Sequence, residues 1–158
     1  MKLLLVIAAL IALVALGLAV RVRTAPDRVA DWHVDPVEGA RTGKPNDVLV
    51  GPMAGADRPA PTWDASPEML MHSFSMVAEG AENTTLLAGS EQALHATWIQ
   101  RTPLMAFPDY ISVRALPAEG GATLAIWSRS RYGHSDLGVN ARRVADWIAA
   151  VDLPRVGE

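Results

Sequence analysis

The stretch Ser128–Asn140, with the sequence SRSRYGHSDLGVN, determines how the C-terminal half of this chain is organised. It follows a segment of alternating apolar residues, which is typical of a strand, and precedes apolar residues at helical spacing. Gly133 lies between the two patterns, and glycine at such a boundary favours a turn. We therefore expect this stretch to join the last strand of a sheet to the last helix.

Upstream of this stretch, four segments show the two-residue alternation of half-buried strands. They are residues 84–88, 94–99, 110–116 and 122–126, and short links such as Gly120-Gly121 predict an antiparallel meander. One face of the expected sheet is apolar and contains Leu94, Trp98, Ile111, Val113, Leu124 and Ile126.

Two amphipathic helices are expected to cover this apolar face. The first begins after Ser66, a suitable N-cap followed by Pro67, and spans about residues 67–79. The second begins with Ser135-Asp136 or Asn140 as its N-cap. The predicted fold class is therefore α+β, with an antiparallel sheet of about four strands, two flanking helices and one N-terminal transmembrane helix.

The transmembrane helix is predicted from residues 3–20, an unbroken run of 18 apolar residues with basic residues on both sides. A helix of this length is about 27 Å long, close to the thickness of a bilayer core, about 30 Å. Residues 1–23 are therefore predicted to be a membrane anchor. A cleaved signal peptide is the alternative, but Gly17-Leu18-Ala19 is a poor cleavage site.

The orientation of the anchor follows from two opposing arguments. Arg21, Arg23 and Arg28 follow the apolar run while Lys2 precedes it, and charge counting alone would leave the domain in the cytoplasm. Anchors this close to the N-terminus commonly export the chain that follows. The expected location is therefore the inner membrane, with a single span and a periplasmic domain.

Residues 24–64 are predicted to form an extended arm in front of a domain that spans residues 65–158. The arm holds six of the 11 prolines, which disfavour helix, and its one strand candidate is residues 47–50. Trp32 and Trp63 predict that the arm docks on the domain, because an indole gains free energy on burial.

Composition excludes several classes of function. The chain has no cysteine, which rules out disulfides and thiolate chemistry. Its four histidines lack metal-ligand spacing, so neither a metal nor another cofactor is predicted. Eleven basic and 17 acidic residues follow Arg23, a formal charge of −6, and so acidic a domain has no electrostatic footprint for nucleic acid.

The sheet face opposite the helices is expected to be polar and basic. By strict alternation it collects His95, Arg101, Tyr110, Arg114, Trp127 and Arg129. One interpretation is a shallow site for an anionic or planar ligand, in which arginines bind carboxylate or phosphate and the rings stack. The other is that the proline-rich arm covers this face, with the arginines paired to Asp109 or to acidic residues of the arm.

The stretch SRSRYGHSDLGVN adds a second argument for an anion. Free backbone donors at the start of a helix attract anions, and Arg129 and Arg131 lie beside this start. Asp136 supplies the alternative, because its carboxylate can occupy the same donors and pair with an arginine. The candidate ligand-binding residues are Arg101, Arg114, Trp127, Arg129, Arg131 and Asp136.

Several of these residues resemble a motif of domain-of-unknown-function family 1499. The matching residues are Arg101-Thr102-Pro103, Phe107-Pro108-Asp109, Ser128–Arg131, Gly133, Asp136–Asn140 and Arg142 or Arg143, with Asn46-Asp47 as a weaker match. The resemblance covers residues 45–151 and implies a bacterial envelope protein with an N-terminal anchor. It implies no activity or catalytic residue, and because the chain lacks a lipobox cysteine, the apolar helix itself must be the anchor.

We therefore expect a membrane-anchored envelope protein whose α+β domain binds an anionic small molecule or an envelope partner protein, with residues 3–20 in the membrane. An alternative from another class is a hydrolase or transferase that uses Asp109, Asp136 and His134, which requires the three groups to meet in a cleft. A third hypothesis, a structural subunit of a membrane complex, predicts membrane partners and no small-molecule binding.

Overall fold

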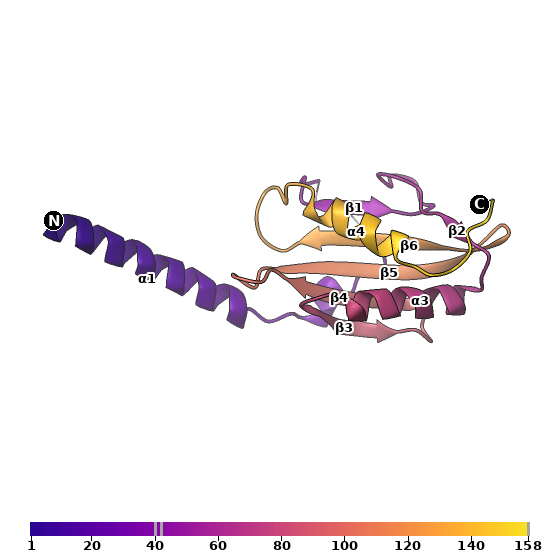
Figure 1. Cartoon of the computed structure of the whole chain (residues 1–158), viewed down its shortest axis with the longest axis horizontal. Helices are drawn as coiled ribbons and strands as arrows, with labels where there is room; N and C mark the ends of the chain where they lie inside the picture. The colour runs from indigo at the N-terminus through magenta and orange to yellow at the C-terminus, as the bar shows by residue number, and fades with distance from the viewer. Residues whose placement is uncertain (40, 42, 158) are drawn as a thin grey trace.

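The computed structural model describes residues 1–39, 41 and 43–157 of the chain (Figure 1). In chain order its elements are α1 (Lys2–Thr24), α2 (Val29–Trp32), β1 (Asp47–Val50), β2 (Thr62–Trp63), α3 (Pro67–Gly80), β3 (Thr84–Ser90), β4 (His95–Arg101), β5 (Pro108–Ala118), β6 (Gly121–Ser130) and α4 (Val139–Ala149). The order confirms the α+β class, with an apolar helix at the N-terminus.

The strands form one antiparallel sheet in the order β1-β6-β5-β4-β3, and β2 also pairs with β6. The sheet has six strands, so the prediction of about four was wrong. The two additional strands come from the segment assigned to the arm, where Asp47 pairs with Arg129 and Trp63 with Ala122. The first of them, β1, confirms the strand candidate at residues 47–50, whereas β2 was not expected. β2 has only two residues, and its pairing depends on β6 rather than on any local pattern.

The helices α3 and α4 cover one face of the sheet and enclose the core (Figure 1). Phe74 of α3 lies between Trp98 and Trp147, with ring centroids 6.0 and 5.9 Å away. The predicted cap of α3 is confirmed, because the Met69 amide donates to Ser66 Oγ over 3.3 Å. All six residues of the predicted apolar face belong to this core or pack against it.

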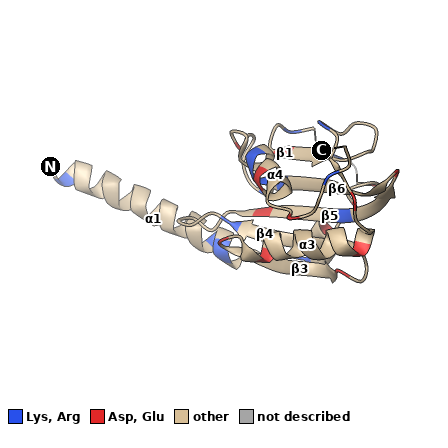
Figure 2. Cartoon of the chain, turned by 45° about the vertical axis from the view of Figure 1, so that its right-hand side comes forward, with Lys and Arg blue, Asp and Glu red and all other residues tan. Residues whose placement is uncertain are grey.

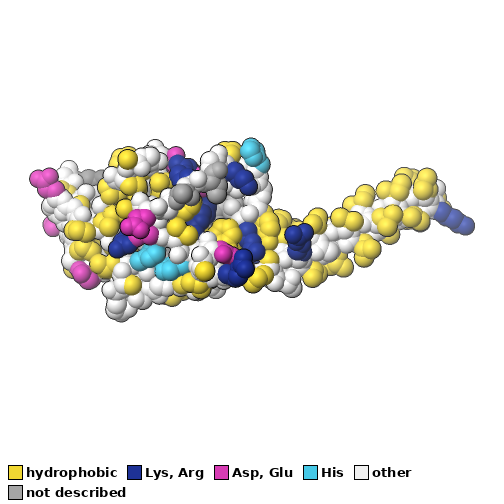
Figure 3. Space-filling model, turned by 180° about the vertical axis from the view of Figure 1, so that it is seen from behind, with side chains coloured by type: hydrophobic (Ala, Val, Ile, Leu, Met, Phe, Trp, Pro, Cys, Tyr) yellow, Lys and Arg dark blue, Asp and Glu magenta, His cyan; other side chains and the backbone are white. Residues whose placement is uncertain are grey.

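The opposite face of the sheet is covered by residues 26–37, which we call the covering segment. Trp32 stacks on Tyr110 of β5, with ring centroids 3.9 Å apart and planes at 6°. His33 stacks on His95 of β4 with centroids 4.1 Å apart. Figure 3 looks onto this face and shows basic, acidic and histidine side chains gathered on it. The docking of the arm through Trp32 is therefore confirmed.

Helix α1 extends away from the domain (Figure 1). Its most apolar 18-residue window has a mean hydropathy of 3.2, so it is long and apolar enough to cross a membrane, a property that signal sequences share. Ala19 and Val22, near its C-terminal end, are buried, whereas the large apolar side chains of residues 3–18 and Val20 are exposed. The domain thus contacts only the last turns of this helix.

The start of α4 differs from both predicted N-caps. Gly138 occupies the N-cap with a left-handed φ of 78°, and Asn140 lies inside the helix, fully buried. The carboxylate of Asp136 accepts hydrogen bonds from the Gly138 and Asn140 amides over 3.0 and 2.7 Å, two and four residues along the chain. This side chain therefore organises the turn before the helix without being its N-cap.

Candidate functional site

The candidate site is centred on Arg129 of β6. Trp127 and Arg129 are two residues apart in a strand, so both lie on the face beneath the covering segment. The guanidinium carbon of Arg129 is 4.1 Å from the ring centroid of Trp127 and 5.6 Å from that of Trp32. The residue is only 6% exposed, and the two indoles hold its cation away from water.

Among the described residues, Arg129 donates hydrogen bonds to neutral acceptors. Its Nη1 donates to Ser112 Oγ over 3.1 Å and to the Trp127 carbonyl over 3.4 Å, and its Nη2 donates to the Trp32 carbonyl over 2.6 Å. Within the described part of the chain, no carboxylate forms a salt bridge with it. Burial lowers the pKa of Arg129 to about 10, although Asp47 and Tyr110 act in the opposite direction. A buried cation without a counter-ion is unfavourable.

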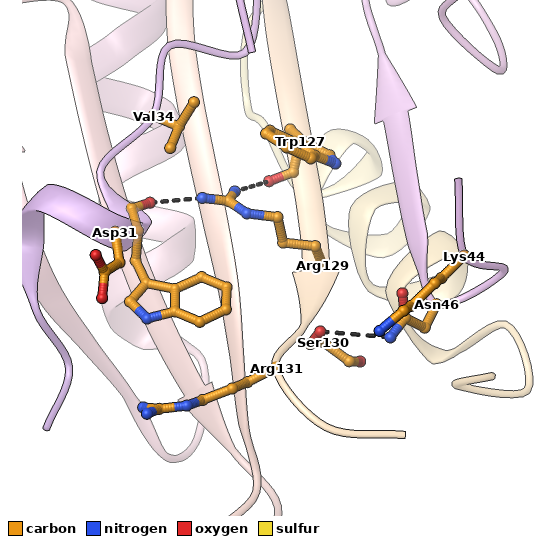
Figure 4. Close-up of a pocket in the computed structure, with 9 residues that line it drawn as sticks. Asp31, Val34, Lys44, Asn46, Trp127, Arg129, Ser130 and Arg131 are labelled. Atoms are coloured by element: carbon orange, nitrogen blue, oxygen red, sulfur yellow. Dashed lines mark hydrogen bonds between the residues drawn. The ribbon is translucent and has the colours of Figure 1, made fainter. Parts of the chain in front are cut away.

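Arg129 borders a cavity of about 410 Å³, a volume within the range of small-molecule sites (Figure 4). Its lining consists of Asp31, Trp32, Val34, Lys44, Asn46, Trp127, Arg129, Ser130 and Arg131. Three of these residues are basic, and the one acid, Asp31, already accepts a hydrogen bond from Arg28 Nε over 2.8 Å. The lining of the cavity therefore combines aromatic rings with basic side chains, of which Arg131 also lies near Asp27.

A hydrogen-bonded chain holds the indole wall of this cavity in place. Trp127 Nε1 donates to the Asp47 carboxylate over 2.8 Å. Arg41 binds the same carboxylate through Nη2 and Nε, over 2.6 and 3.1 Å. Because the bidentate pair fixes Asp47, the ring of Trp127 is oriented before any ligand arrives.

The other two predicted arginines of this face bind acids of the covering segment. Arg101 Nη2 donates to Asp27 over 2.5 Å, and Arg114 forms an ion pair with Asp35. Arg131 lies 3.5 Å from Asp27, yet its side chain also reaches the cavity. The structure thus brings Trp127, Arg129 and Arg131 together at the cavity, and it places Arg101 and Arg114 in contacts that hold the covering segment.

Asp136, the sixth candidate, lies at the start of α4 and does not line this cavity. Its carboxylate also accepts a hydrogen bond from Asn140 Nδ2 over 2.8 Å. Burial raises the pKa of Asp136, but the hydrogen bonds from Asn140 and Gly138 outweigh burial and hold the pKa below its ordinary value. The anion expected at this helix start is therefore supplied by the protein's own side chain.

A buried polar network beneath α4 was not predicted. Arg143 Nη2 donates to Asp109 over 2.7 Å, and both side chains are at least nine-tenths buried. Arg143 also binds Ser128, Asn140 and Gln100. Asp109, Ser128, Asn140 and Arg143 all belong to the motif quoted above, and that co-occurrence was the signal that could have identified them.

The three groups of the enzyme hypothesis are not assembled for catalysis. Asp109 and Asp136 line an apolar hollow of about 230 Å³, but Arg143 holds the first and backbone amides hold the second. His134 is exposed and does not line this hollow. Among the described residues, no group of three or more acidic or histidine side chains could hold a metal ion.

The stack of His33, in the covering segment, on His95 of β4 predicts a pH dependence. Burial lowers the pKa of His33, as does the charge of His95, while Asp35 opposes both. Burial also lowers the pKa of His95, and Arg114 adds to this, whereas Asp35 and a hydrogen bond to the Val34 carbonyl act against it. Both pKa values thus lie below 6.5 in the folded protein.

The unfolded chain therefore binds more protons than the folded chain at acidic pH. Stability should be highest above about pH 7 and fall as the pH drops below about 6.5 towards 5. Urea unfolding across this range checks the expectation. His95→Asn should reduce the loss on acidification, and a slope equal to that of the natural protein would contradict the assignment.

These observations define a class of protein: an α+β domain with an antiparallel sheet, behind an N-terminal helix apolar enough to span a membrane, with a basic aromatic cavity under a covering segment. Residues 40–151 match the family described as protein of unknown function, DUF1499, and the chain belongs to this family. No curated protein and no solved structure matches the chain.

Proposed function

We propose that the protein is a single-span membrane protein whose domain binds an anionic small molecule in the cavity beside Arg129. The observation that supports this proposal most directly is that Arg129 is 6% exposed and that, among the described residues, its guanidinium donates hydrogen bonds to neutral acceptors. An incoming carboxylate or phosphate would supply the missing counter-charge and accept hydrogen bonds in the fork geometry that arginine favours.

The shape of the cavity favours a small ligand over a protein surface. Its volume of about 410 Å³ is suited to a small molecule, and one wall consists of indole rings. Arg131 adds a second guanidinium to its lining. The proposed ligand therefore has one anionic group for Arg129 and a planar or apolar part that contacts Trp32 or Trp127.

The proposed location is the inner membrane of a bacterium, with α1 as the span and the domain on the periplasmic side. The apolar length of α1 supports the span. An N-terminal anchor that exports the following chain supports the periplasmic side. Binding of an envelope ligand would then occur close to the membrane surface.

Thermal unfolding of the full chain in detergent, with inorganic phosphate as the probe, tests the ligand. At about 100 times its dissociation constant, a bound anion stabilises by about 2.7 kcal/mol, which raises the melting temperature by about 5–10 °C. Arg129→Gln should remove this response, because it removes the buried cation. Without phosphate, this variant should lose some stability, because the Ser112 hydroxyl and the Trp32 carbonyl lose their donor, so each variant is compared with its own phosphate-free melting temperature.

Arg142→Gln is the matched control, because Arg142 is an exposed arginine of α4 that binds a loop carbonyl outside the cavity. It should retain the full phosphate response. An equal rise in the melting temperature of Arg129→Gln would overturn the proposed site. The proposed ligand class would be overturned if phosphate, citrate and acetate all fail to raise the melting temperature of the natural protein.

A further inference from the structure

Two loops at one end of the domain each present a leucine to solvent. Leu104, between β4 and β5, is 80% exposed, and Leu137, between β6 and α4, is 83% exposed. Apart from Met1, no other large apolar side chain in the described residues is as exposed, including those of α1. Such exposure is unfavourable in water, so a surface that covers both leucines would stabilise the protein.

Both leucines are held in place by their loops. The Leu137 backbone adopts a left-handed φ of 55°, which is uncommon for a residue with a large side chain. Its amide donates to Ser135 Oγ over 3.2 Å, and its carbonyl accepts a hydrogen bond from Arg142 over 3.0 Å. The loop of Leu104 is closed by two hydrogen bonds between Thr102 and Phe107, each 3.0 Å long. The exposed side chains are therefore presented by ordered backbone.

The same end of the domain meets α1. Arg23, in the last turn of α1, donates to the Leu104 carbonyl over 2.7 Å, and Val22 beside it is buried. Figure 1 shows the β4–β5 and β6–α4 loops at the end of the domain where α1 arrives, with the C-terminus at the other end. If α1 spans a bilayer, Arg23 lies at the level of the lipid headgroups, and so does the Leu104 loop.

The space between the two loops is also apolar. Phe107 and Tyr132 lie with ring centroids 5.9 Å apart, and together with Val139 they line the hollow of about 230 Å³. Basic residues lie at this end, in the last turn of α1 and in α4 (Figure 2). Apolar tips surrounded by arginine and aromatic side chains are the composition of segments that lie in the membrane interface.

We propose that Leu104 and Leu137 insert into the lipid–water interface of the membrane that α1 crosses, so that the domain rests on the bilayer in one orientation. This inference rests on the membrane anchoring proposed above and is independent of the anionic ligand. The anchor keeps both loops next to the lipid, so even a weak affinity for the interface suffices to hold them there. The arginines beside the leucines would face the phosphate groups of the lipids.

The absence of cysteine from the chain allows a direct test with single labels. The full chain carrying Leu104→Cys or Leu137→Cys is labelled with the environment-sensitive fluorophore NBD and reconstituted into phosphatidylcholine–phosphatidylglycerol vesicles. We expect a blue shift, a several-fold increase in emission, and quenching by lipids that carry a spin label near the headgroup. The matched control is Val156→Cys, a site that is 48% exposed and near the C-terminus at the opposite end.

The label at position 156 should emit as in water and escape the lipid quencher. An alkaline wash of the vesicles tests the anchor separately, because it removes protein that does not span the membrane. Water-like emission at 104 and 137 from protein that remains after the wash would overturn the lipid contact and leave the anchor supported. Loss of the chain in the wash would overturn both. If the emission rises only when the ratio of protein to lipid is raised, the leucines contact a second copy of the chain and the lipid contact is overturned. If it rises only after another protein is added, they contact that protein, and the lipid contact is likewise overturned.

Discussion

Replacing Arg143 with methionine is expected to lower the free energy of unfolding by about 3–5 kcal/mol, because it leaves the buried Asp109 carboxylate without its counter-charge. The two groups are 2.7 Å apart, and their side chains are 7% and 9% exposed. Methionine keeps most of the volume of the arginine, so the loss of stability reflects the broken ion pair between Arg143 and Asp109 rather than a new cavity. Urea unfolding of the full chain in detergent micelles measures the change.

The rest of the network increases this effect. Arg143 Nη1 also donates to Ser128 Oγ over 3.2 Å and to Asn140 Oδ1 over 2.7 Å. Removal of the guanidinium leaves these buried acceptors with fewer donors. The double variant Asp109→Leu with Arg143→Met should lose less stability than the sum of the two single variants, because it leaves neither charge unpaired.

The neighbouring Arg142 provides the control for this prediction. It belongs to the same helix but is exposed, with a hydrogen bond to the Leu137 carbonyl. Arg142→Met should leave stability nearly unchanged. Similar losses at both positions would show that the pair with Asp109 does not contribute as the geometry indicates.

Replacing Trp32 with alanine is expected to release the covering segment from the sheet. The indole ring stacks on the ring of Tyr110 with centroids 3.9 Å apart. The guanidinium carbons of Arg129 and Arg131 lie 5.6 and 5.7 Å from the centroid of the indole. A fully buried tryptophan loses about 3–5 kcal/mol on such a change, so the half-buried Trp32 should lose about 2 kcal/mol. The covering segment should then open about 30 times more often.

Trypsin cleavage after Arg28 measures this opening, because the bond lies inside the covering segment and the Arg28 side chain is 72% exposed. Where opening and closing are fast, the cleavage rate follows the fraction of open molecules. Val29→Ala, in the same short helix but at an exposed position, is the matched control and should leave the rate nearly unchanged. Equal rates for Trp32→Ala and the control would show that the stacked indole does not hold the segment.

Release of the covering segment would also weaken binding of the proposed ligand. Trp32 contributes its carbonyl to Arg129 and lies in the cavity wall. A variant that exposes Arg129 to water should therefore respond less to phosphate than the natural protein, because water screens the charge. The covering segment is thus expected to shape the site as well as to conceal part of it.

Local patterns predicted much of the fold, for reasons that individual elements make clear. The helix expected at residues 67–79 is observed as Pro67–Gly80, because Ser66 and Pro67 define its start without help from the rest of the chain. The four predicted strands are all present, since alternation is a property of adjacent residues. β1 and β2 joined the sheet through β6, which lies far along the chain, and no local pattern indicates that pairing.

The candidate site was predicted in part. Trp127 and Arg129 were identified from the alternation of their strand, and Arg131 from the stretch that follows it. Lys44 and Asn46 were not identified, because they reach the cavity from a segment more than 80 residues away in the chain. The start of α4 was misplaced because the Asp136 side chain occupies the amides that a conventional N-cap would satisfy. Asn140 was consequently expected at the cap, whereas it lies buried in the polar network.

By itself, the sequence determined which face of the sheet each arginine occupies, because side chains alternate along a strand whatever surrounds it. The tertiary structure decided which of those arginines is neutralised. Arg101 and Arg114 meet acids of the covering segment, while the hydrogen bonds of Arg129 to the described residues end on neutral oxygens. Pairing of charges depends on distance in space between residues far apart in the chain, and only the folded protein sets that distance.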